Sequence, residues 1–340
     1  MLHSFRLFIT GSALMLCLAC GKLGELQPTP AHTPTEPSPG PNELWLKAHG
    51  VTCFQLRWAA GELVTDPFWS WQSMPALAFR KLQTDSARVE AAAQQMRNVR
   101  YIVVGHAHYD HAQDLPYLLR LLPDDVQVLG SQTLQHLLAP YGLAARVVPM
   151  DSLAGVPGQA GTPWYAPDSS FRAFAFRSHH VPHIFGIHIA HKKLQAPRKK
   201  PPVRSSHWVD GGNLSFWMEW GSPASNGAYS VRHRVFFMDG VSTFPNGLPD
   251  VGKLGTKVDA AIVSCALHNK ANGYPQGLFK TLDADRWVLC HWESFFRSRD
   301  KPLKPLMMTN VQAFTDTLHH YEGKPAEPIL PGLRRWYRLK

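Results

Sequence analysis

Cysteine is scarce in this chain, with five residues in 340. Cys17 and Cys20 lie near the amino terminus, and the other three, Cys53, Cys265 and Cys290, cannot all pair with one another because their number is odd. Cys265 and Cys290 end neighbouring predicted strands, so a disulfide between them stays open for an oxidising compartment. The alternative is that both are free thiols of the core.

The chain also lacks an apolar run that would comfortably span a bilayer as a permanent helix, because its amino-terminal stretch, Leu7 to Ala19, is too short. This stretch follows a short basic start with Arg6 and precedes Cys20. We expect residues 1–20 to be a lipoprotein-type signal peptide. The pattern Leu-Cys-Leu-Ala-Cys at 16–20 resembles a bacterial lipobox, with Cys17 where leucine is usual.

Cys20 is therefore the expected lipidation site, and the expected location is the bacterial cell envelope, lipid-anchored and facing the periplasm or exterior. Ordinary secretion and an uncleaved anchor are the alternatives. Residues 21–41 are rich in proline, which predicts an extended tether that would hold the rest of the chain off a membrane. Residues 42–340 are long enough and apolar enough to bury one large core, and no internal repeat is visible.

Acidic residues are in deficit: 25 Asp and Glu face 35 Lys and Arg, a net charge of +10. For an exported protein this balance suits phospholipid headgroups, phosphate esters or anionic polymers, and no nucleic-acid partner is expected. A proline-rich segment concentrates the cations, namely Lys192, Lys193, Arg198, Lys199, Lys200 and Arg204. It predicts either a lid or anion-attracting patch near an active site, or a solvated loop.

Strand and helix patterns alternate along residues 42–340, which predicts an α/β fold. Strands are expected at 52–58, 62–65, 101–104, 126–129, 145–148 and 171–176, and later near Ile184, Leu214, Val231, Ala260 and Val288. Helices are expected at 86–96, with Ser86 as the cap, and at 114–120, 131–138 and 310–321.

The densest chemistry lies in the run Gly-His-Ala-His-Tyr-Asp-His at 105–111, directly after the strand at 101–104. His106 and His108 are two residues apart and project to one side of an extended segment. Asp110 and His111 follow in the turn and point to a neighbouring position. Four ligands split into two pairs suit two adjacent cations better than one. The alternative is a surface or core histidine cluster satisfied by hydrogen bonds.

This run matches the His-x-His-x-Asp-His signature of the metallo-β-lactamase superfamily, and the resemblance extends along most of the chain after its amino terminus. It implies an αββα sandwich. It also implies an aspartate closing an early strand, which Asp66 supplies, and a histidine after a later strand. Three histidines follow the strand at 171–176, and His180 fits best, ahead of His179 and His183.

The resemblance further implies a bridging aspartate and a last histidine, which match Asp239 and His291 at the ends of two later strands. By the family pattern, one metal would be held by His106, His108 and His180. The second would be held by Asp110, His111 and His291, with Asp239 between the two metals. Asp66 would orient the ligand loop from outside the ligand set. Zinc is the expected metal, and manganese and iron suit the same ligands.

Two metals would lower the pKa of a water between them and so supply a hydroxide nucleophile. The expected activity is an exported hydrolase acting on an ester, lactone, amide or phosphodiester bond of a small-molecule or phospholipid-like substrate. Asp110 and His268 are the residues expected to act in catalysis, His268 as proton donor or oxygen ligand, with a structural role as its alternative. The competing hypothesis is a non-catalytic surface binding protein that retains the fold.

Tyr109 makes the motif similar to a branch that includes N-acylphosphatidylethanolamine phospholipase D and ascorbate-phosphate lactonase. Tyr109 packing under the metal loop is the alternative explanation. Three tryptophans flank the predicted site loops, Trp69, Trp71 and Trp292, and either line an apolar pocket or belong to the core. Hydrolysis of β-lactams and redox chemistry at a di-iron centre are disfavoured, the latter because the chain has no room for a flavin domain.

Overall fold

The computed structural model describes residues 21–33, 35–182, 190–322 and 327–340. The predicted signal peptide with Cys20, the third histidine candidate His183 and the strand expected at Ile184 lie outside these residues. No helix among the described residues has the length and apolar character needed to cross a membrane.

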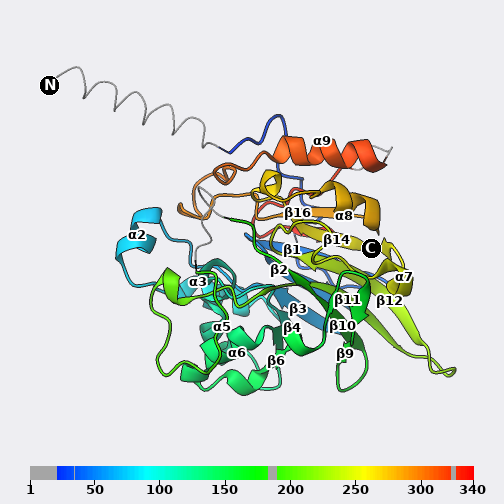
Figure 1. Cartoon of the computed structure of the whole chain (residues 1–340), viewed down its shortest axis with the longest axis horizontal. Helices are drawn as coiled ribbons and strands as arrows, with labels where there is room; N and C mark the ends of the chain where they lie inside the picture. Colours follow the sequence, from blue (N-terminus) through cyan, green and yellow to red (C-terminus); the bar gives the residue numbers. More distant parts are fainter. Residues whose placement is uncertain (1–20, 34, 183–189, 323–326) are drawn as a thin grey trace.

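Two mixed β-sheets face each other at the centre of the molecule (Figure 1). The first has seven strands in the order β17 (Trp336–Arg338), β1 (Trp45–Gly50), β2 (Cys53–Trp58), β3 (Gly61–Thr65), β4 (Val99–Val103), β5 (Gln127–Gly130) and β6 (Val147–Pro149). Strands β3 to β6 are parallel, so their carboxyl ends lie at one edge.

The second sheet has eight strands in the order β16 (Trp287–Cys290), β14 (Ala260–Ser264), β12 (Tyr229–Met238), β11 (Asn213–Pro223), β10 (Phe171–Ser178), β7 (Ala154–Val156) and β8 (Gln159–Gly161), with β9 (Trp164–Tyr165) paired to β10. Strands β12, β14 and β16 are parallel. A small separate pair joins β13 (Lys257–Val258) to β15 (Asp283–Ala284).

Alternation along the strands sorts side chains between the sheets and the helices. In β4, Tyr101 and Val103 point into the core between the two sheets, whereas Ile102 points to the helices on the outer face. Both faces of each sheet are covered, so apolar residues such as these are buried on either side of a strand.

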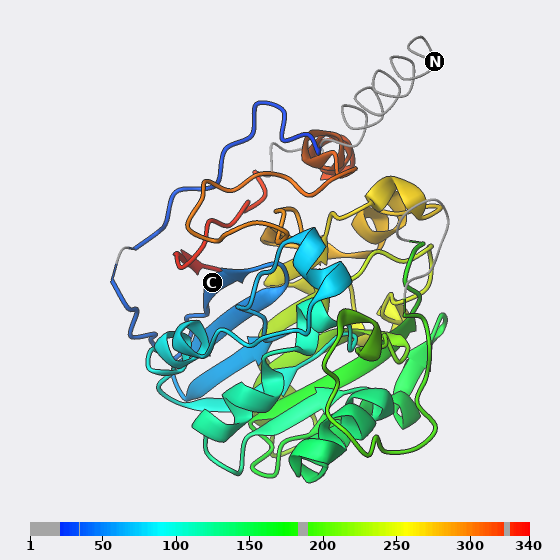
Figure 2. The ribbon, with the colours of Figure 1, turned by 90° about the vertical axis from the view of Figure 1, so that its left-hand side faces the viewer.

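The helices lie on the two outer faces, which confirms the predicted αββα sandwich (Figures 1 and 2). On the first sheet pack α3 (Ser86–Ala93), α5 (Leu115–Leu121) and α6 (Gln132–Leu138). On the second pack α8 (Gln276–Thr281) and α9 (Val311–Glu322). Three further helices, α2 (Met74–Phe79), α4 (Tyr109–Ala112) and α7 (Val251–Leu254), lie in connections.

The helix caps partly follow the sequence. The Ser131 hydroxyl accepts a hydrogen bond from the Leu134 N–H at the start of α6. Helix α3 is shorter than the expected 86–96, and its cap is Asp85 rather than Ser86, because the Asp85 carboxylate accepts from the Arg88 N–H.

The proline-rich segment, predicted to be an extended tether, lies along the domain in its described part (Figure 2). The Lys22 N–H donates to the Thr309 carbonyl and the Thr29 N–H donates to the Leu330 carbonyl. Glu36 forms ion pairs of 2.8 Å with Lys47 and with Arg57, two cations that are almost fully buried. These contacts make residues 21–33 and 35–41 a covering strip of the domain, so little of the segment is left to act as a spacer.

Candidate metal centre

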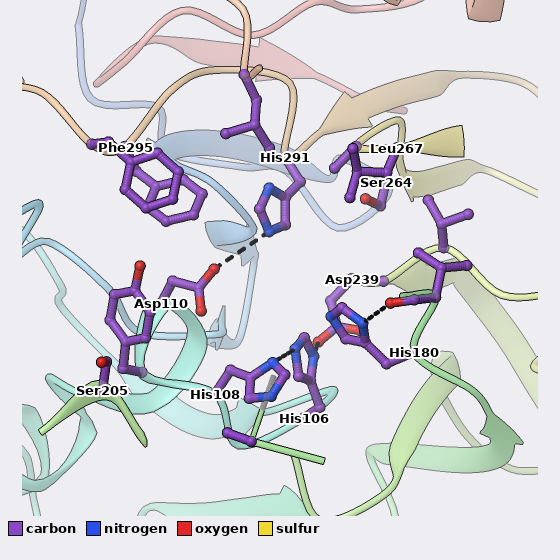
Figure 3. Close-up of a pocket in the computed structure, with 18 of the residues that line it drawn as sticks. His106, His108, Asp110, His180, Ser205, Asp239, Ser264, Leu267, His291 and Phe295 are labelled. Atoms are coloured by element: carbon purple, nitrogen blue, oxygen red, sulfur yellow. Dashed lines mark hydrogen bonds and ion pairs between the residues drawn. The ribbon is translucent and has the colours of Figure 1, made fainter. Parts of the chain in front are cut away.

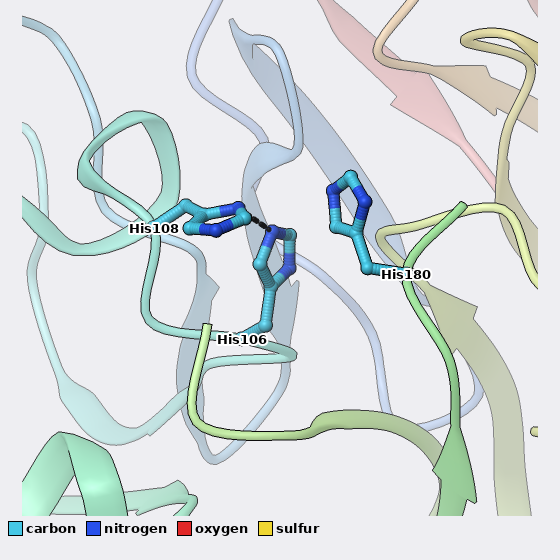
Figure 4. Close-up of side chains that lie close together, drawn as sticks. All are labelled: His106, His108 and His180. Atoms are coloured by element: carbon cyan, nitrogen blue, oxygen red, sulfur yellow. Dashed lines mark hydrogen bonds between the residues drawn. The ribbon is translucent and has the colours of Figure 1, made fainter. Parts of the chain in front are cut away.

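The histidine-rich loop begins where β4 ends. His106 Nδ1 lies 2.6 Å from Asp239 Oδ2, and His106 Nε2 lies 3.0 Å from His108 Nδ1 (Figures 3 and 4). Gly105 permits this approach, because a Cβ atom built on it would lie 2.2 Å from the Asp239 carboxylate. The glycine of the motif is therefore required by the closeness of the loop to the end of β12.

Asp66 holds the loop from the end of β3. Its Oδ1 accepts a hydrogen bond from the Gly105 N–H at 2.9 Å, and its Oδ2 lies 2.9 Å from His111 Nδ1. The Thr52 hydroxyl also lies 2.9 Å from His111 Nδ1, a contact that the sequence did not predict. His111 Nδ1 also lies 3.4 Å from Asp239 Oδ2, while its Nε2 lies 3.7 Å from Asp110 Oδ2. Asp66 thus contacts both the loop backbone and an imidazole, the kinds of donor that the sequence analysis named for it.

Asp110 and His291 approach each other from the two sheets. Asp110 Oδ2 lies 3.6 Å from His291 Nε2 and 3.7 Å from His111 Nε2. Burial alone would raise the pKa of Asp110, but the nearby His111 and His291 outweigh it and hold this pKa well below its ordinary value. His291 follows β16 with a φ of 56°, an unfavourable backbone region for a non-glycine residue.

His180 and His179 follow β10 and take opposite directions. The His180 ring is half-buried, with its centroid 5.2 Å from that of His106 and 5.1 Å from that of His108. His179 is exposed, and its backbone N–H donates to the Ser242 hydroxyl at 2.9 Å. The structure therefore brings His180, and not His179, to the histidine cluster.

The potential ligand atoms form three overlapping groups, in each of which all atoms lie within 4.8 Å of one another. The groups are His106, His108 and His180; His106, His111 and Asp239; and Asp110, His111 and His291. The first and third match the two ligand sets implied by the sequence motif. Asp239 lies with histidines of both sets, which is the position expected for a bridging carboxylate.

The donors fit divalent metal ions. Three buried carboxylates, Asp66, Asp110 and Asp239, lie among imidazoles, and within the described part of the chain their ion pairs are with histidine and not with lysine or arginine. Burial and the neighbouring Asp239 charge raise the pKa of Asp66 to about 7. Burial lowers the pKa of His111, but Asp110 and Asp66 outweigh it and raise this pKa to about 9. Such a cluster is stabilised by added positive charge, and imidazole with carboxylate suits zinc, manganese or iron.

A cavity of about 350 Å³ opens over these residues. His106, His108, Asp110, His180, Asp239 and His291 line it, together with Tyr109 and the hydroxyls of Ser205 and Ser264. Most of the remaining wall is apolar: Met74, Leu77, Ala78, Val181, Trp208, Val241, Leu267, Phe295, Phe296, Leu306, Met307 and Met308. No lysine or arginine is among the described lining residues, so the cluster is the charged part of an otherwise apolar cavity.

His268 does not line the cavity, so its predicted catalytic role is not supported by its position. The chain turns at Leu267, which has a φ of 54°, and Leu267 rather than His268 faces the cavity. His268 Nδ1 lies 3.2 Å from the Cys265 carbonyl, and its ring packs against Phe314 of α9. These contacts favour the structural role that the sequence left open.

The predicted tryptophans belong to the core. Trp69 and Trp292 are buried in the core and Trp71 packs against a small cluster that includes Phe68; none of the three is among the described lining residues. Trp208 lines the cavity instead, and no sequence signal distinguished it. Tyr109 contributes to the wall and packs edge-on against Phe68, with ring centroids 6.0 Å apart.

Cys53, Cys265 and Cys290 are free and buried, so the possible disulfide is not formed. Cys265 and Cys290 do lie on neighbouring strands, and the Cys265 N–H donates to the Cys290 carbonyl. No residue from 192 to 204 is among the described lining residues, so the cations of this segment do not line the cavity; Ala190 and Ser205, on either side of it, do.

Comparisons with known proteins agree with this architecture. Residues 62–196 match the model of the beta-lactamase superfamily domain. A search of curated proteins gave no match. Among solved structures, Igni18, a novel metallo hydrolase from the archaeon Ignicoccus hospitalis, aligns with a TM-score of 0.54 at 14% identity, covering 87% of this chain and 98% of its own.

An isothiocyanate hydrolase from Delia radicum gut bacteria aligns with a TM-score of 0.50 at 10% identity, covering 86% of this chain and 98% of its own. Yeast PDE1 aligns with a TM-score of 0.50 at 8% identity, covering 86% of this chain and 99% of its own. At these identities the likeness is one of fold. The matched domain contains the histidine motif and Asp66, and the shared fold extends over most of the chain, so this chain resembles the metallo-β-lactamase superfamily in both fold and motif.

Proposed function

We propose that the chain is a metal-dependent hydrolase with two metal ions, which cleaves an ester, lactone or phosphodiester bond. The observation that carries this proposal is the convergence of seven ligand side chains in three overlapping groups at one end of the cavity. One ion would be held by His106, His108 and His180, and the other by Asp110, His111 and His291. Asp239 would contribute to both sites. When bound, the ions would supply a water of lowered pKa and an electrophile for the substrate oxygen.

The chain's own residues would orient the ligands and exclude water. Asp66 keeps the His111 ring in place through Nδ1, and the Gly105 contact fixes the loop against Asp239. The apolar wall lowers the polarity around the cluster, which strengthens electrostatic interactions within it. Tyr109, Ser205 and Ser264 are the hydroxyl groups available to contact a polar part of the substrate.

The cavity favours a substrate with an apolar portion. Its wall offers methionine, leucine and phenylalanine side chains and no lysine or arginine to bind a second anionic group. An ester, lactone or phosphodiester joined to an aliphatic or aromatic group fits this lining better than a highly charged phosphate ester.

The proposed site of action is the bacterial cell envelope. The expected signal peptide at 1–20 and the lipidation of Cys20 support it, and both rest on the sequence pattern alone. Because residues 21–33 and 35–41 lie along the domain, an anchor at Cys20 would hold the domain close to the membrane surface.

The test is metal-dependent turnover. We expect the chain, stripped by a chelator and reloaded with zinc, manganese or iron, to hydrolyse nitrophenyl acyl esters or bis-nitrophenyl phosphate. The rate should increase with acyl chain length, because longer chains contact more of the apolar wall. His111→Ala should lose activity, whereas the matched variant His179→Ala should keep it. A metal-loaded, folded chain inactive on the whole panel would favour the non-catalytic binding protein.

A further inference from the structure

Helix α2 forms one wall of the cavity and also exposes apolar side chains to solvent. Met74, Leu77 and Ala78 line the cavity, while Met74 is 44% exposed and Phe79 is 82% exposed. None of its six residues is buried, and the helix projects at the left-hand margin of Figure 1. An exposed phenylalanine beside a cavity mouth is costly in water, which indicates a partner for this surface.

The exposed surface continues onto a second segment. The Leu82 N–H donates to the Val203 carbonyl at 2.9 Å, and the Ser205 hydroxyl donates to the Leu77 carbonyl at 3.4 Å. These bonds place Val203, which is 39% exposed, beside α2. We call Met74, Phe79 and Val203 the apolar rim.

Cations flank the apolar rim. Arg80 and Lys81 directly follow α2, and Arg204 directly follows Val203; all three are exposed. The sequence has no aspartate or glutamate from 72 to 84 or from 190 to 204, although the second range contains six lysines and arginines. The charged side chains of these two ranges are therefore all positive.

We propose that the apolar rim and its flanking cations dock on the surface of an anionic phospholipid bilayer, with the cavity mouth facing the lipid. Phe79 and Met74 would enter the boundary between headgroups and acyl chains, and Arg80, Lys81 and Arg204 would contact the phosphates. We favour a membrane over a protein partner, because a small apolar centre with cations around it is typical of membrane contact.

This docking would bring the proposed hydrolase to substrates dissolved in the membrane. Leu77 and Ala78 give a continuous apolar path from the rim to the cavity. A substrate with an apolar tail could then pass from the bilayer to the metal site without exposing the tail to water. This consequence rests on the proposed function, whereas docking itself does not.

The test reads the local environment of α2 in the full chain. Phe79→Cys is labelled with an environment-sensitive dye in a chain with Cys17→Ser and Cys20→Ser, because the three remaining cysteines are free and buried and so do not compete for the label. The control label is at Ser225→Cys, an exposed residue between β11 and β12. Vesicles contain phosphatidylcholine alone or with phosphatidylglycerol, and a spin-labelled lipid serves as quencher.

We expect the dye at position 79 to shift to the blue and to be quenched by the spin-labelled lipid on anionic vesicles, while the dye at position 225 does not respond. Each of Arg80→Gln, Lys81→Gln and Arg204→Gln should weaken the response at 79 roughly fivefold, and all three together about a hundredfold. The matched triple variant Arg232→Gln, Lys253→Gln and Arg286→Gln has the same net charge and should have a much smaller effect.

A dye at position 79 that stays in water while the chain sediments with anionic vesicles would overturn the proposal. Equal responses at 79 and 225 would overturn it as well, because the contact would not be specific to α2. The dye reports contact and not turnover. An inactive chain that still responds at 79 would therefore count against the proposed hydrolase and not against docking.

Discussion

Two adjacent histidines, His179 and His180, show how finely the backbone selects a potential ligand. His180 is half-buried beside His106 and His108, whereas His179 is exposed and bonded only through its backbone N–H to Ser242 among the contacts described. Successive residues of an extended chain point to opposite sides, which explains the difference.

His180→Ala should therefore lower the metal content by about one ion per chain, whereas His179→Ala should leave it unchanged. Elemental mass spectrometry on the two variants, purified in parallel, makes this comparison. Loss of metal in His179→Ala with retention in His180→Ala would reverse the assignment of the ligand.

The stability of the fold should depend on pH through a single residue, His49 in β1. Its ring is buried beside Trp69, and burial, with a contribution from Arg299, lowers its pKa from 6.5 to about 3. Between these values the unfolded chain binds a proton at His49 that the folded chain does not bind. The free energy of unfolding therefore decreases as the pH falls below 6.5.

His49→Phe keeps a ring and removes the titration. Between pH 7.5 and pH 4.5, the free energy of unfolding should decrease in both proteins. We expect the decrease to be about 2 to 3 kcal/mol smaller in this variant than in the wild type. Urea unfolding of both proteins at the two pH values measures the difference. Parallel losses in the two proteins would show that His49 does not contribute.

At the scale of elements, the segment 35–41 is held by ion pairs rather than by secondary structure. Glu36 is one-third exposed but contacts Lys47 and Arg57, whose side chains are only 4% and 5% exposed. Arg57 has a second partner in Glu62, at 2.6 Å, which limits the cost of losing Glu36.

Glu36→Gln should reduce the free energy of unfolding by about 1 to 3 kcal/mol, because it leaves two buried cations short of negative charge. Glu25→Gln, at an exposed position of the preceding residues 21–33, is the control and should change the free energy of unfolding by less than about 0.5 kcal/mol. Urea denaturation gives both values. Equal effects of the two substitutions would mean that the segment is a loose tether after all.

Sequence reasoning succeeded for elements with a local signal. The strands at 62–65, 101–104 and 126–129 lie within one or two residues of β3, β4 and β5, and the motif at 105–111 lies where the strand ends. Periodicity and capping residues give such signals within a few residues of chain.

Features that depend on distant packing had no such signal. Leu267 takes a left-handed backbone conformation and so turns His268 away from the cavity, although both follow the same strand. The cavity wall at Met74, Leu77 and Met308 joins segments more than 200 residues apart, and their apolar residues read equally well as core. Proline content predicted an extended tether at 21–41 but gave no information on what residues 21–33 and 35–41 contact.

At the scale of the whole molecule, the residues of the candidate metal centre come from both sheets. Asp66 and the histidine loop follow strands of the first sheet, whereas His180, Asp239 and His291 follow strands of the second. Metal ions bound here would link the two halves of the sandwich. Because they would bind the folded chain and not the unfolded chain, they should stabilise the fold.

Removing the metal should therefore lower the unfolding temperature. Free metal at about 100 times Kd contributes about 2.7 kcal/mol, a change of several degrees for a domain of this size. Calorimetry with and without a chelator measures the effect, and readdition of metal should reverse it. A wild-type unfolding temperature that is indifferent to chelation would show that the two sheets do not share a metal.

The number of metal ions per chain tests the central claim most directly. Elemental mass spectrometry on the full chain, purified without chelator or added metal, should find about two equivalents of zinc, manganese or iron. A folded chain that binds no metal, or no more than one equivalent even after reconstitution with each ion, would contradict the dinuclear centre at His106, His111 and Asp239.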